Sequence, residues 1–133
     1  MLQGLELNAS VRVLPFLDPS VLAAVYRRAS VVLLPSEREG FGLPVVEAMA
    51  CGTSVVGSDI PVLREVGGDA TTYCGVGDVQ HWTETVLELL RERREEPDRW
   101  ARRCNACLQQ AAKFTWQEHA RRMVEVYQHV LNS

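Results

Sequence analysis

The sequence predicts an α/β fold in which a parallel sheet is flanked by helices and followed by further helices. Between residues 11 and 77, short runs of β-branched residues alternate with helical segments, an order typical of parallel strands joined by right-handed crossovers. The runs at 31–34 and 54–57 lack alternation of apolar and polar residues, which is typical of strands buried on both faces. From Asp78 onward the pattern is helical throughout.

The first expected strand lies at residues 11–14, and a helix should follow it. Asp18 can cap the start of that helix, and Pro19 suits its first turn, where no backbone amide is needed as a donor. The apolar residues of the segment recur at helical spacing and share one face: Leu22, Val25, Tyr26 and Ala29.

A loop joins the second expected strand, 31–34, to a helix over 43–51, and Gly52 should end that helix. The pattern beyond Gly52 predicts three further elements in sequence. They are a strand at 54–57, a short helix at 60–65 ended by Gly67 and Gly68, and a weak strand at 70–73.

Three helices are expected in the C-terminal part. The first covers 79–94, and the Glu-Pro step at 96–97 separates it from a second helix that reaches about residue 112. Thr115 and Glu118 have the spacing of a capping box, which should start the third helix. The apolar residues of the third helix share one side: Trp116, Ala120, Met123, Val124, Tyr127 and Val130.

The composition is that of a globular domain and excludes several classes of protein. The 133 residues are 47% hydrophobic and 23% charged with a net charge of −3, so no basic field is available to hold nucleic acid. No segment approaches the ~20 apolar residues of a membrane span, and the first residues lack the pattern of a secretory signal. We therefore expect a cytoplasmic protein whose four cysteines are reduced.

Two features of the late helical segment are expected to be structural. Cys104 and Cys107 form a C-x-x-C pair, but no second pair completes a zinc site and no strand precedes them as in a thioredoxin-like motif. Six arginines in the same part of the chain are expected to form a solvated face: Arg91, Arg93, Arg94, Arg99, Arg102 and Arg103.

The residues from Glu39 to Glu47 carry the expected chemistry. Gly40 and Gly42 lie between a strand and a helix, where glycine allows a sharp turn and close approach of the backbone to a ligand. The start of the helix, which tolerates Pro44, offers free amides and the positive end of a dipole to a phosphate or diphosphate. The two carboxylates would repel an anion but can bind hydroxyl groups on either side of it, as in a nucleotide sugar. A plain strand-to-helix turn with two solvated carboxylates is the alternative.

Residues 35–52, Pro-Ser-Glu-Arg-Glu-Gly-Phe-Gly-Leu-Pro-Val-Val-Glu-Ala-Met-Ala-Cys-Gly, closely resemble the signature of the retaining glycosyltransferases of the glycogen-synthase-like, family-four type. Glu39 and Glu47 have the spacing of that family's motif, in which seven residues separate two glutamates. The similarity continues through 55–59, 65–70 and the last predicted helix. It implies a Rossmann-like parallel sheet, part of the C-terminal, donor-binding half of the two-domain GT-B fold.

The resemblance also implies roles for individual residues. Glu39 would hold hydroxyls of the donor sugar, and Glu47 would bind the ribose hydroxyls of the nucleotide. The donor would be a UDP- or GDP-sugar, transferred to a hydroxyl acceptor with retention of configuration. Neither a cofactor nor a divalent metal is expected, since no Asp-x-Asp motif is present. The diphosphate would lie against the glycine loop: Gly40, Phe41, Gly42 and Leu43.

Members of this family are considerably longer than this chain. Residues 1–133 are therefore expected to be a fragment, a partial C-terminal nucleotide-sugar-binding domain without the acceptor domain and the first two strand–helix units. The absent part carries the basic residues that neutralise the leaving diphosphate, so we expect the isolated chain to be inactive. The acceptor, and any membrane surface, would contact only the full-length enzyme. A non-catalytic nucleotide- or nucleotide-sugar-binding module is the alternative, and an α/β domain without a ligand is a third interpretation.

The resemblance finally predicts assembly. In the strand order three-two-one-four-five-six, residues 11–14 match the third strand and 31–34 the fourth, and the two strands between them are absent. Open apolar strand edges and the apolar side of the last helix invite contact with another chain. We expect a homo-oligomer formed through these edges. The rival arrangement is a monomer in which 11–14 lies directly beside 31–34.

Overall fold

The computed structural model describes residues 10–132 and contains a parallel sheet of three short strands. The strands are β1 (Val32–Leu34), β2 (Val55–Ser58) and β3 (Thr72–Cys74), and they lie in the order β1-β2-β3. Val32 pairs with Val55, and Val56 pairs with Thr72. The predicted α/β class with a parallel sheet is confirmed, and the order matches the last three strands of the expected arrangement.

Helices cover both faces of the sheet. Val55 of β2 packs in one cluster with side chains of α2, α3 and α5, whereas Val56, the next residue, packs with Leu89 of α4 on the opposite face. This alternation follows from the two-residue period of a strand. The helices are α1 (Pro19–Arg28), α2 (Leu43–Ala50), α3 (Pro61–Gly67), α4 (Val79–Glu95), α5 (Pro97–Ala111) and α6 (Trp116–Leu131), and a 3₁₀ turn, η2 (Gly68–Ala70), follows α3.

Local sequence decides where several helices begin and end. Pro19 lies in the first turn of α1 as predicted, with Asp18 at the N-cap position, although the Asp18 side chain makes no capping hydrogen bond. Gly52 follows α2 with a φ of 73°, which is the left-handed conformation expected after a helix end. Thr115 caps α6, since its Oγ1 accepts a hydrogen bond of 3.1 Å from the amide of Glu118.

The middle strand is buried on both faces, but the first strand is not. All four residues of β2 are buried, as predicted, whereas Leu33 of β1 remains 47% exposed. The expectation that the strand at 31–34 is buried on both faces is therefore wrong for the face that carries Leu33. The reason is that α4 makes its main contacts with the sheet at β3, the opposite edge, so it covers the side of β1 that carries Leu33 only in part.

The predicted strand at 11–14 is not present. Residues 11–18 have no regular structure, and Val13 is 82% exposed. A strand needs a neighbour for its backbone hydrogen bonds, and β1 pairs only with β2 within residues 10–132. The arrangement in which 11–14 lies beside 31–34 in one chain is therefore wrong as well.

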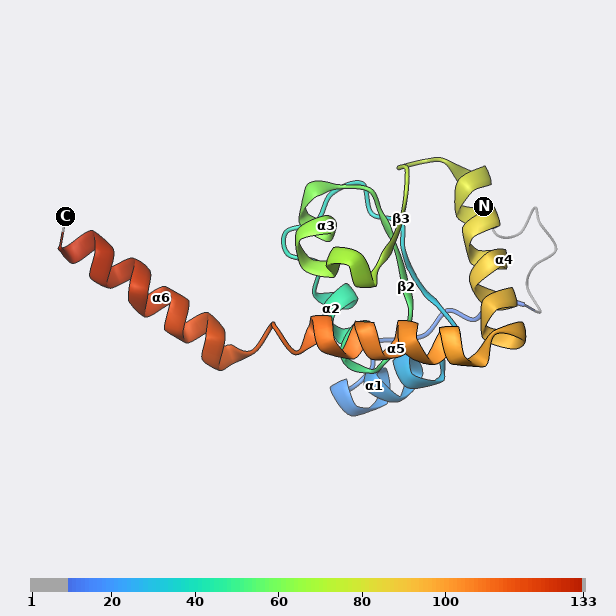
Figure 1. The fold of residues 1–133 in the computed structure, drawn as a ribbon, viewed down its shortest axis with the longest axis horizontal. Helices are drawn as coiled ribbons and strands as arrows, with labels where there is room; N and C mark the ends of the chain where they lie inside the picture. The colour runs from blue at the N-terminus through green and yellow to red at the C-terminus, as the bar shows by residue number, and fades with distance from the viewer. Residues whose placement is uncertain (1–9, 133) are drawn as a thin grey trace.

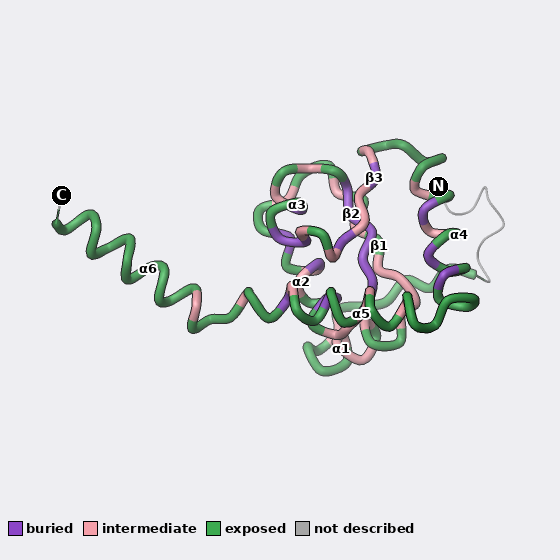
Figure 2. The backbone as a smooth tube through the Cα atoms, in the orientation of Figure 1, coloured by how far each residue is buried: buried purple, intermediate pink, exposed green. Residues whose placement is uncertain are grey.

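The last helix projects from the domain (Figure 1). None of its residues is buried, and Figure 2 shows α6 exposed along almost all of its length while the buried residues gather around the sheet. Its predicted apolar side is open to solvent, with Trp116 84% and Tyr127 61% exposed. Ion pairs one turn apart, such as Arg122–Glu118 at 2.8 Å, support the helix along its own surface.

Two further findings concern the whole described region. Within residues 10–132, no helix combines the length and the apolar character needed to cross a bilayer. The four cysteines are free, and burial raises the pKa of the Cys107 thiol to about 11. The Sγ atom of Cys107 lies 3.6 Å from the carbonyl oxygen of Ala70, which it contacts as a donor. Cys107 therefore acts as a buried packing residue of α5.

Candidate functional site

The candidate site is the loop between β1 and α2, which leaves the sheet at the carboxyl end of β1. Gly42 is buried, has a φ of 84° and occupies the N-cap position of α2. A Cβ atom at this position would lie 2.8 Å from Cδ2 of Leu63, which is fully buried. Both the backbone conformation and the space therefore require glycine here.

Gly40, which was also expected to make a sharp turn, does not need to be glycine for that reason. It is exposed, it is not among the glycines with a positive φ, and an added Cβ would meet no atom within 4 Å. The sharp turn predicted for both glycines is thus made by Gly42 alone. Gly40 leaves open space on the outer side of the loop.

The start of α2 presents backbone donors toward the end of the loop. The amide of Val45 is the first that turns back into the helix, donating to the carbonyl of Gly42 at 2.9 Å. Leu43 is the first helical residue, and Pro44 has no amide hydrogen. The amides of Phe41, Gly42 and Leu43, which precede Val45, thus have no carbonyl acceptor in a preceding turn. Free amides of this kind at a helix N-terminus favour the binding of an anion.

Glu39 lies in the loop and is half-buried. Its Oε1 accepts a hydrogen bond of 2.6 Å from Oγ of Ser36, three residues earlier in the same loop. This short contact holds the carboxylate against the loop. Its other oxygen has no hydrogen-bond partner among residues 10–132, and can accept one from a ligand.

Glu47 lies on the exposed side of α2, one turn beyond the helix start. Its Oε2 accepts a hydrogen bond of 3.3 Å from the hydroxyl of Tyr26, a residue of α1. Burial, followed by the nearby carboxylate, raises the pKa of Tyr26. A tyrosine is protonated near neutral pH even at its ordinary pKa, so the phenol can act as the donor. Helical spacing placed Tyr26 on the apolar face of α1, but the contact of its hydroxyl with Glu47 was not predicted.

The remaining side chains of the loop face outward or toward the end of α5. Phe41 is 49% and Leu43 57% exposed. The ring of Phe41 meets that of Phe114 edge to face, with centroids 6.1 Å apart. The loop is therefore in contact with the segment that joins α5 to α6, a link that no sequence pattern indicated.

Another charged group follows the carboxyl end of β2. Arg64 of α3 forms a two-point ion pair with Asp59, with Nη2 and Oδ2 2.8 Å apart, and its guanidinium lies 4.6 Å from the centroid of the Tyr73 ring. The hydrogen bond from Arg64 holds the pKa of Asp59 below its usual range. Both side chains are substantially exposed, so this pair adds a salt-dependent tie rather than a buried anchor.

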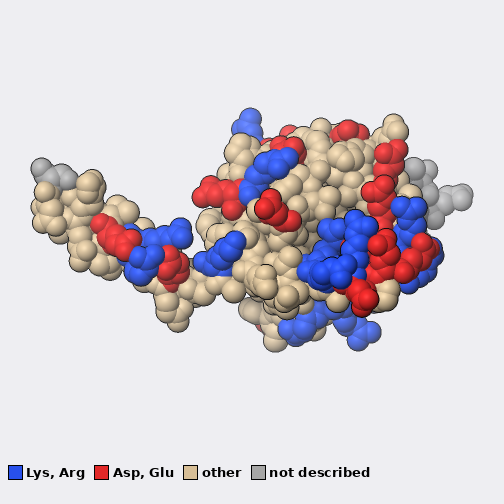
Figure 3. Space-filling model, viewed as in Figure 1, with Lys and Arg blue, Asp and Glu red and all other residues tan. Residues whose placement is uncertain are grey.

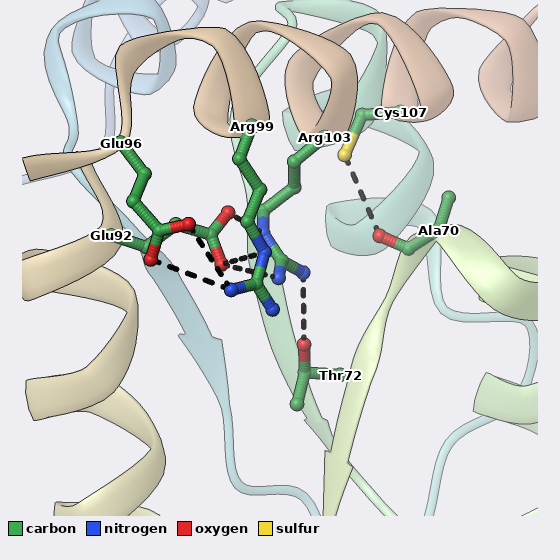
Figure 4. Close-up of polar contacts among 7 residues, drawn as sticks. All are labelled: Ala70, Thr72, Glu92, Glu96, Arg99, Arg103 and Cys107. Atoms are coloured by element: carbon green, nitrogen blue, oxygen red, sulfur yellow. Dashed lines mark hydrogen bonds and ion pairs between the residues drawn. The ribbon is translucent and has the colours of Figure 1, made fainter.

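The second polar cluster of the domain lies where α4 meets α5, away from the loop (Figure 4). Glu92, whose side chain is only 7% exposed, accepts two hydrogen bonds from Arg103, at 2.8 and 2.9 Å. Arg99 approaches the same carboxylate at 3.3 Å. These contacts lower the pKa of Glu92. A cavity of about 420 Å³ adjoins this cluster, and none of its lining residues belongs to the loop or to α2.

The arginine-rich segment is therefore a solvated face only in part. Figure 3 shows Lys and Arg side chains mixed with Asp and Glu at the end where α4 meets α5. Five of the six arginines are exposed as predicted, but Arg103 is half-buried and paired with Glu92. Its acidic partner, eleven residues earlier on α4, explains the difference.

Sequence comparisons place the chain among sugar-transferring enzymes. A family model described as glycosyl transferases group 1 matches residues 1–105. A D-inositol 3-phosphate glycosyltransferase from Thermobispora bispora is 34% identical over 91% of this chain, and an O-antigen chain mannosyltransferase B from Escherichia coli is 34% identical over 88%. The matched parts represent 28% and 30% of those two relatives, so the chain spans less than a third of their length.

A solved structure gives the same result for the fold. A sucrose-phosphate synthase from Thermosynechococcus elongatus superimposes with a TM-score of 0.84 and 27% sequence identity, over 98% of this chain and 33% of that one. The predicted resemblance and the Rossmann-like, GT-B-type architecture are both confirmed. The chain therefore belongs to the glycosyl transferases group 1 family, and it folds as part of a GT-B glycosyltransferase domain.

Proposed function

We propose that this chain binds the nucleoside-diphosphate sugar donor of a glycosyltransferase that transfers the sugar to a hydroxyl acceptor with retention of configuration. One observation carries the proposal. Gly42, in the left-handed conformation, starts α2 at the carboxyl end of a parallel strand, and a carboxylate lies on each side of it in the sequence, Glu39 in the loop and Glu47 on the helix. Carboxyl ends of parallel strands are the usual ligand edge of such sheets.

Each part of the donor has a suitable partner in this arrangement. The diphosphate would lie at the glycine loop and accept hydrogen bonds from the amides of Phe41, Gly42 and Leu43. Glu39 would accept hydrogen bonds from hydroxyls of the transferred sugar. Glu47 would accept them from the ribose. The carboxylates would thus orient the donor through its neutral ends while the helix start holds its charge.

The donor that we propose is a UDP- or GDP-sugar bound without a cofactor or divalent metal, as the sequence resemblance implies. The partner is this small molecule rather than nucleic acid, in keeping with the net charge of −3. We place the protein in the cytoplasm, where four free thiols persist. The acceptor, and a membrane surface if one is used, would be contacted by parts of the enzyme that this chain does not contain.

The proposal is tested by titrating the 133-residue chain with UDP and GDP in a calorimeter. We expect weak but saturable binding of at least one of them. Binding of neither nucleotide at millimolar concentration would contradict the proposed function and leave a ligand-free α/β domain as the interpretation.

Transfer is tested separately with nucleotide sugars and a panel of hydroxyl acceptors. We expect no transfer by this chain alone, because it spans less than a third of the relatives that it matches. Stabilisation of the developing charge is the largest catalytic contribution in most enzymes, and loss of one donor group costs ~10²-fold or more. Multiple turnovers by the purified chain would refute this expectation. Nucleotide binding without turnover in any longer form of the protein would favour the non-catalytic binding module.

A further inference from the structure

Tyr26 reaches the candidate site from outside the motif that defines it. Its hydroxyl donates to Oε2 of Glu47 at 3.3 Å, although the two residues are 21 positions apart and lie on different helices. Helices α1 and α2 pack against each other (Figure 1). The contact therefore depends on the packing of two helices, and not on the local conformation of either one.

The position of the Tyr26 ring is set by contacts that do not involve Glu47. The ring packs against the main hydrophobic cluster, which includes Val45 and Met49 of α2. The backbone carbonyl of Tyr26 accepts a hydrogen bond of 2.7 Å from Oγ1 of Thr53, which is only 5% exposed. The hydroxyl is thus presented to Glu47 by a rigid support, and it can be removed without disturbing that support.

From these contacts, we propose that Tyr26 is a positioning residue for Glu47. Its hydroxyl holds one carboxylate oxygen, so that the other is directed toward the ribose hydroxyls of the nucleotide. An unsupported glutamate on an exposed helix face samples several rotamers, and ordering it on binding has an entropic cost. A donor already in place removes part of that cost, which is the general advantage of preorganisation. This inference rests on the proposed function of Glu47.

The test compares ribonucleotides with nucleotides that lack the ribose hydroxyls. Dissociation constants of UDP and GDP, and of their 2′,3′-dideoxy counterparts, are measured for the wild-type chain and for Tyr26→Phe. We expect the dideoxy nucleotide to bind more weakly than the ribonucleotide in the wild type. Tyr26→Phe should weaken ribonucleotide binding roughly three- to tenfold and leave dideoxynucleotide binding unchanged. A general structural defect would weaken both to the same extent.

Thr53→Val provides the matched control. It removes the hydrogen bond to the Tyr26 backbone but retains the phenol and the volume of the side chain. We expect it to lower stability without changing the ratio of the two dissociation constants. An equal change of that ratio in Thr53→Val and Tyr26→Phe would overturn the proposal, because the effect would then come from the placement of α1.

The outcomes separate this proposal from the one on which it rests. If the wild type binds both kinds of nucleotide equally, Glu47 has no ribose role, and the proposed ribose contact and the role of Tyr26 both fall. If it binds neither, the proposed function itself falls. If the wild type discriminates and Tyr26→Phe discriminates just as well, only the positioning role falls. The contact itself is checked without nucleotide by NMR titration, since Glu47→Gln should lower the pKa of Tyr26 toward its ordinary value. An unshifted Tyr26 titration would overturn the proposal.

Discussion

Replacing Gly42 with alanine tests whether the turn at the candidate site depends on glycine for the two reasons that the structure gives. The residue has a φ of 84°, and a non-glycine residue in the left-handed region costs roughly 1–2 kcal/mol. The new Cβ would also lie 2.8 Å from Cδ2 of Leu63. Leu63 is fully buried, so moving its Cδ2 disturbs the core around it, and overpacking of this kind costs about 1–3 kcal/mol.

Together the two effects predict that Gly42→Ala lowers the free energy of unfolding by ~2–5 kcal/mol. Urea denaturation followed by circular dichroism measures this difference, and a shifted midpoint with an unchanged slope identifies a change in stability alone. Gly40→Ala is the matched control in the same loop, because its Cβ meets no atom within 4 Å and its φ is not positive. It should change the free energy of unfolding by less than about 0.5 kcal/mol.

Equal stability of the two variants would refute this reasoning. It would mean that the loop adjusts its backbone at little cost, so that the close fit of Gly42 against Leu63 is not a constraint on the site. A large loss in Gly40→Ala would contradict it in a different way, by showing that the outer side of the loop is packed in solution.

The remaining predictions concern three other contacts. Glu47→Ala should weaken the binding of UDP or GDP about tenfold or more, because a hydrogen bond to a charged group contributes ~1.5–3 kcal/mol. An unchanged dissociation constant in calorimetry would argue against the role of Glu47 in binding the ribose. The pKa of Glu92 is lowered by its hydrogen bonds from Arg103, so its contribution to stability is present above the unfolded-state pKa and is lost as the pH falls through the lower folded-state value. Glu92→Gln should therefore flatten the loss of stability as the pH falls below the ordinary pKa of glutamate, whereas Glu96→Gln, at a side chain that is 53% exposed, should not. Identical dependence of stability on acidic pH in the two variants, measured by urea denaturation, would contradict this. The chain should self-associate at micromolar concentration through the open edge of β1 and the exposed apolar side of α6. Light scattering that gives the monomer mass of 14.9 kDa at every concentration measured would refute this prediction.

Much of the architecture could be predicted from the sequence because it depends on local chemistry. Proline in the first turn of α1, glycine after α2 and the Thr115 cap of α6 act over a few residues, and all three appear where the sequence indicates them. The second bond of the predicted capping box is replaced, since the Glu118 carboxylate pairs with Arg121 and Arg122. The buried strand β2 and the parallel order of the sheet follow from apolar runs separated by helical segments. The family motif located the loop at 35–42, while the roles of Glu39 and Glu47 remain predictions.

Only the tertiary structure decided the features that require a neighbour. Residues 11–14 have the composition of a strand but no adjacent strand within residues 10–132. Leu33 of β1 stays half-exposed because α4 makes its main contacts with the sheet at the opposite edge, on β3. Helical packing joined Tyr26 to Glu47, and the α4–α5 crossing joined Glu92 to Arg103. Side-chain patterns report which face of an element is apolar, whereas the identity of the group across from a hydroxyl or a carboxylate depends on the angles at which the elements pack.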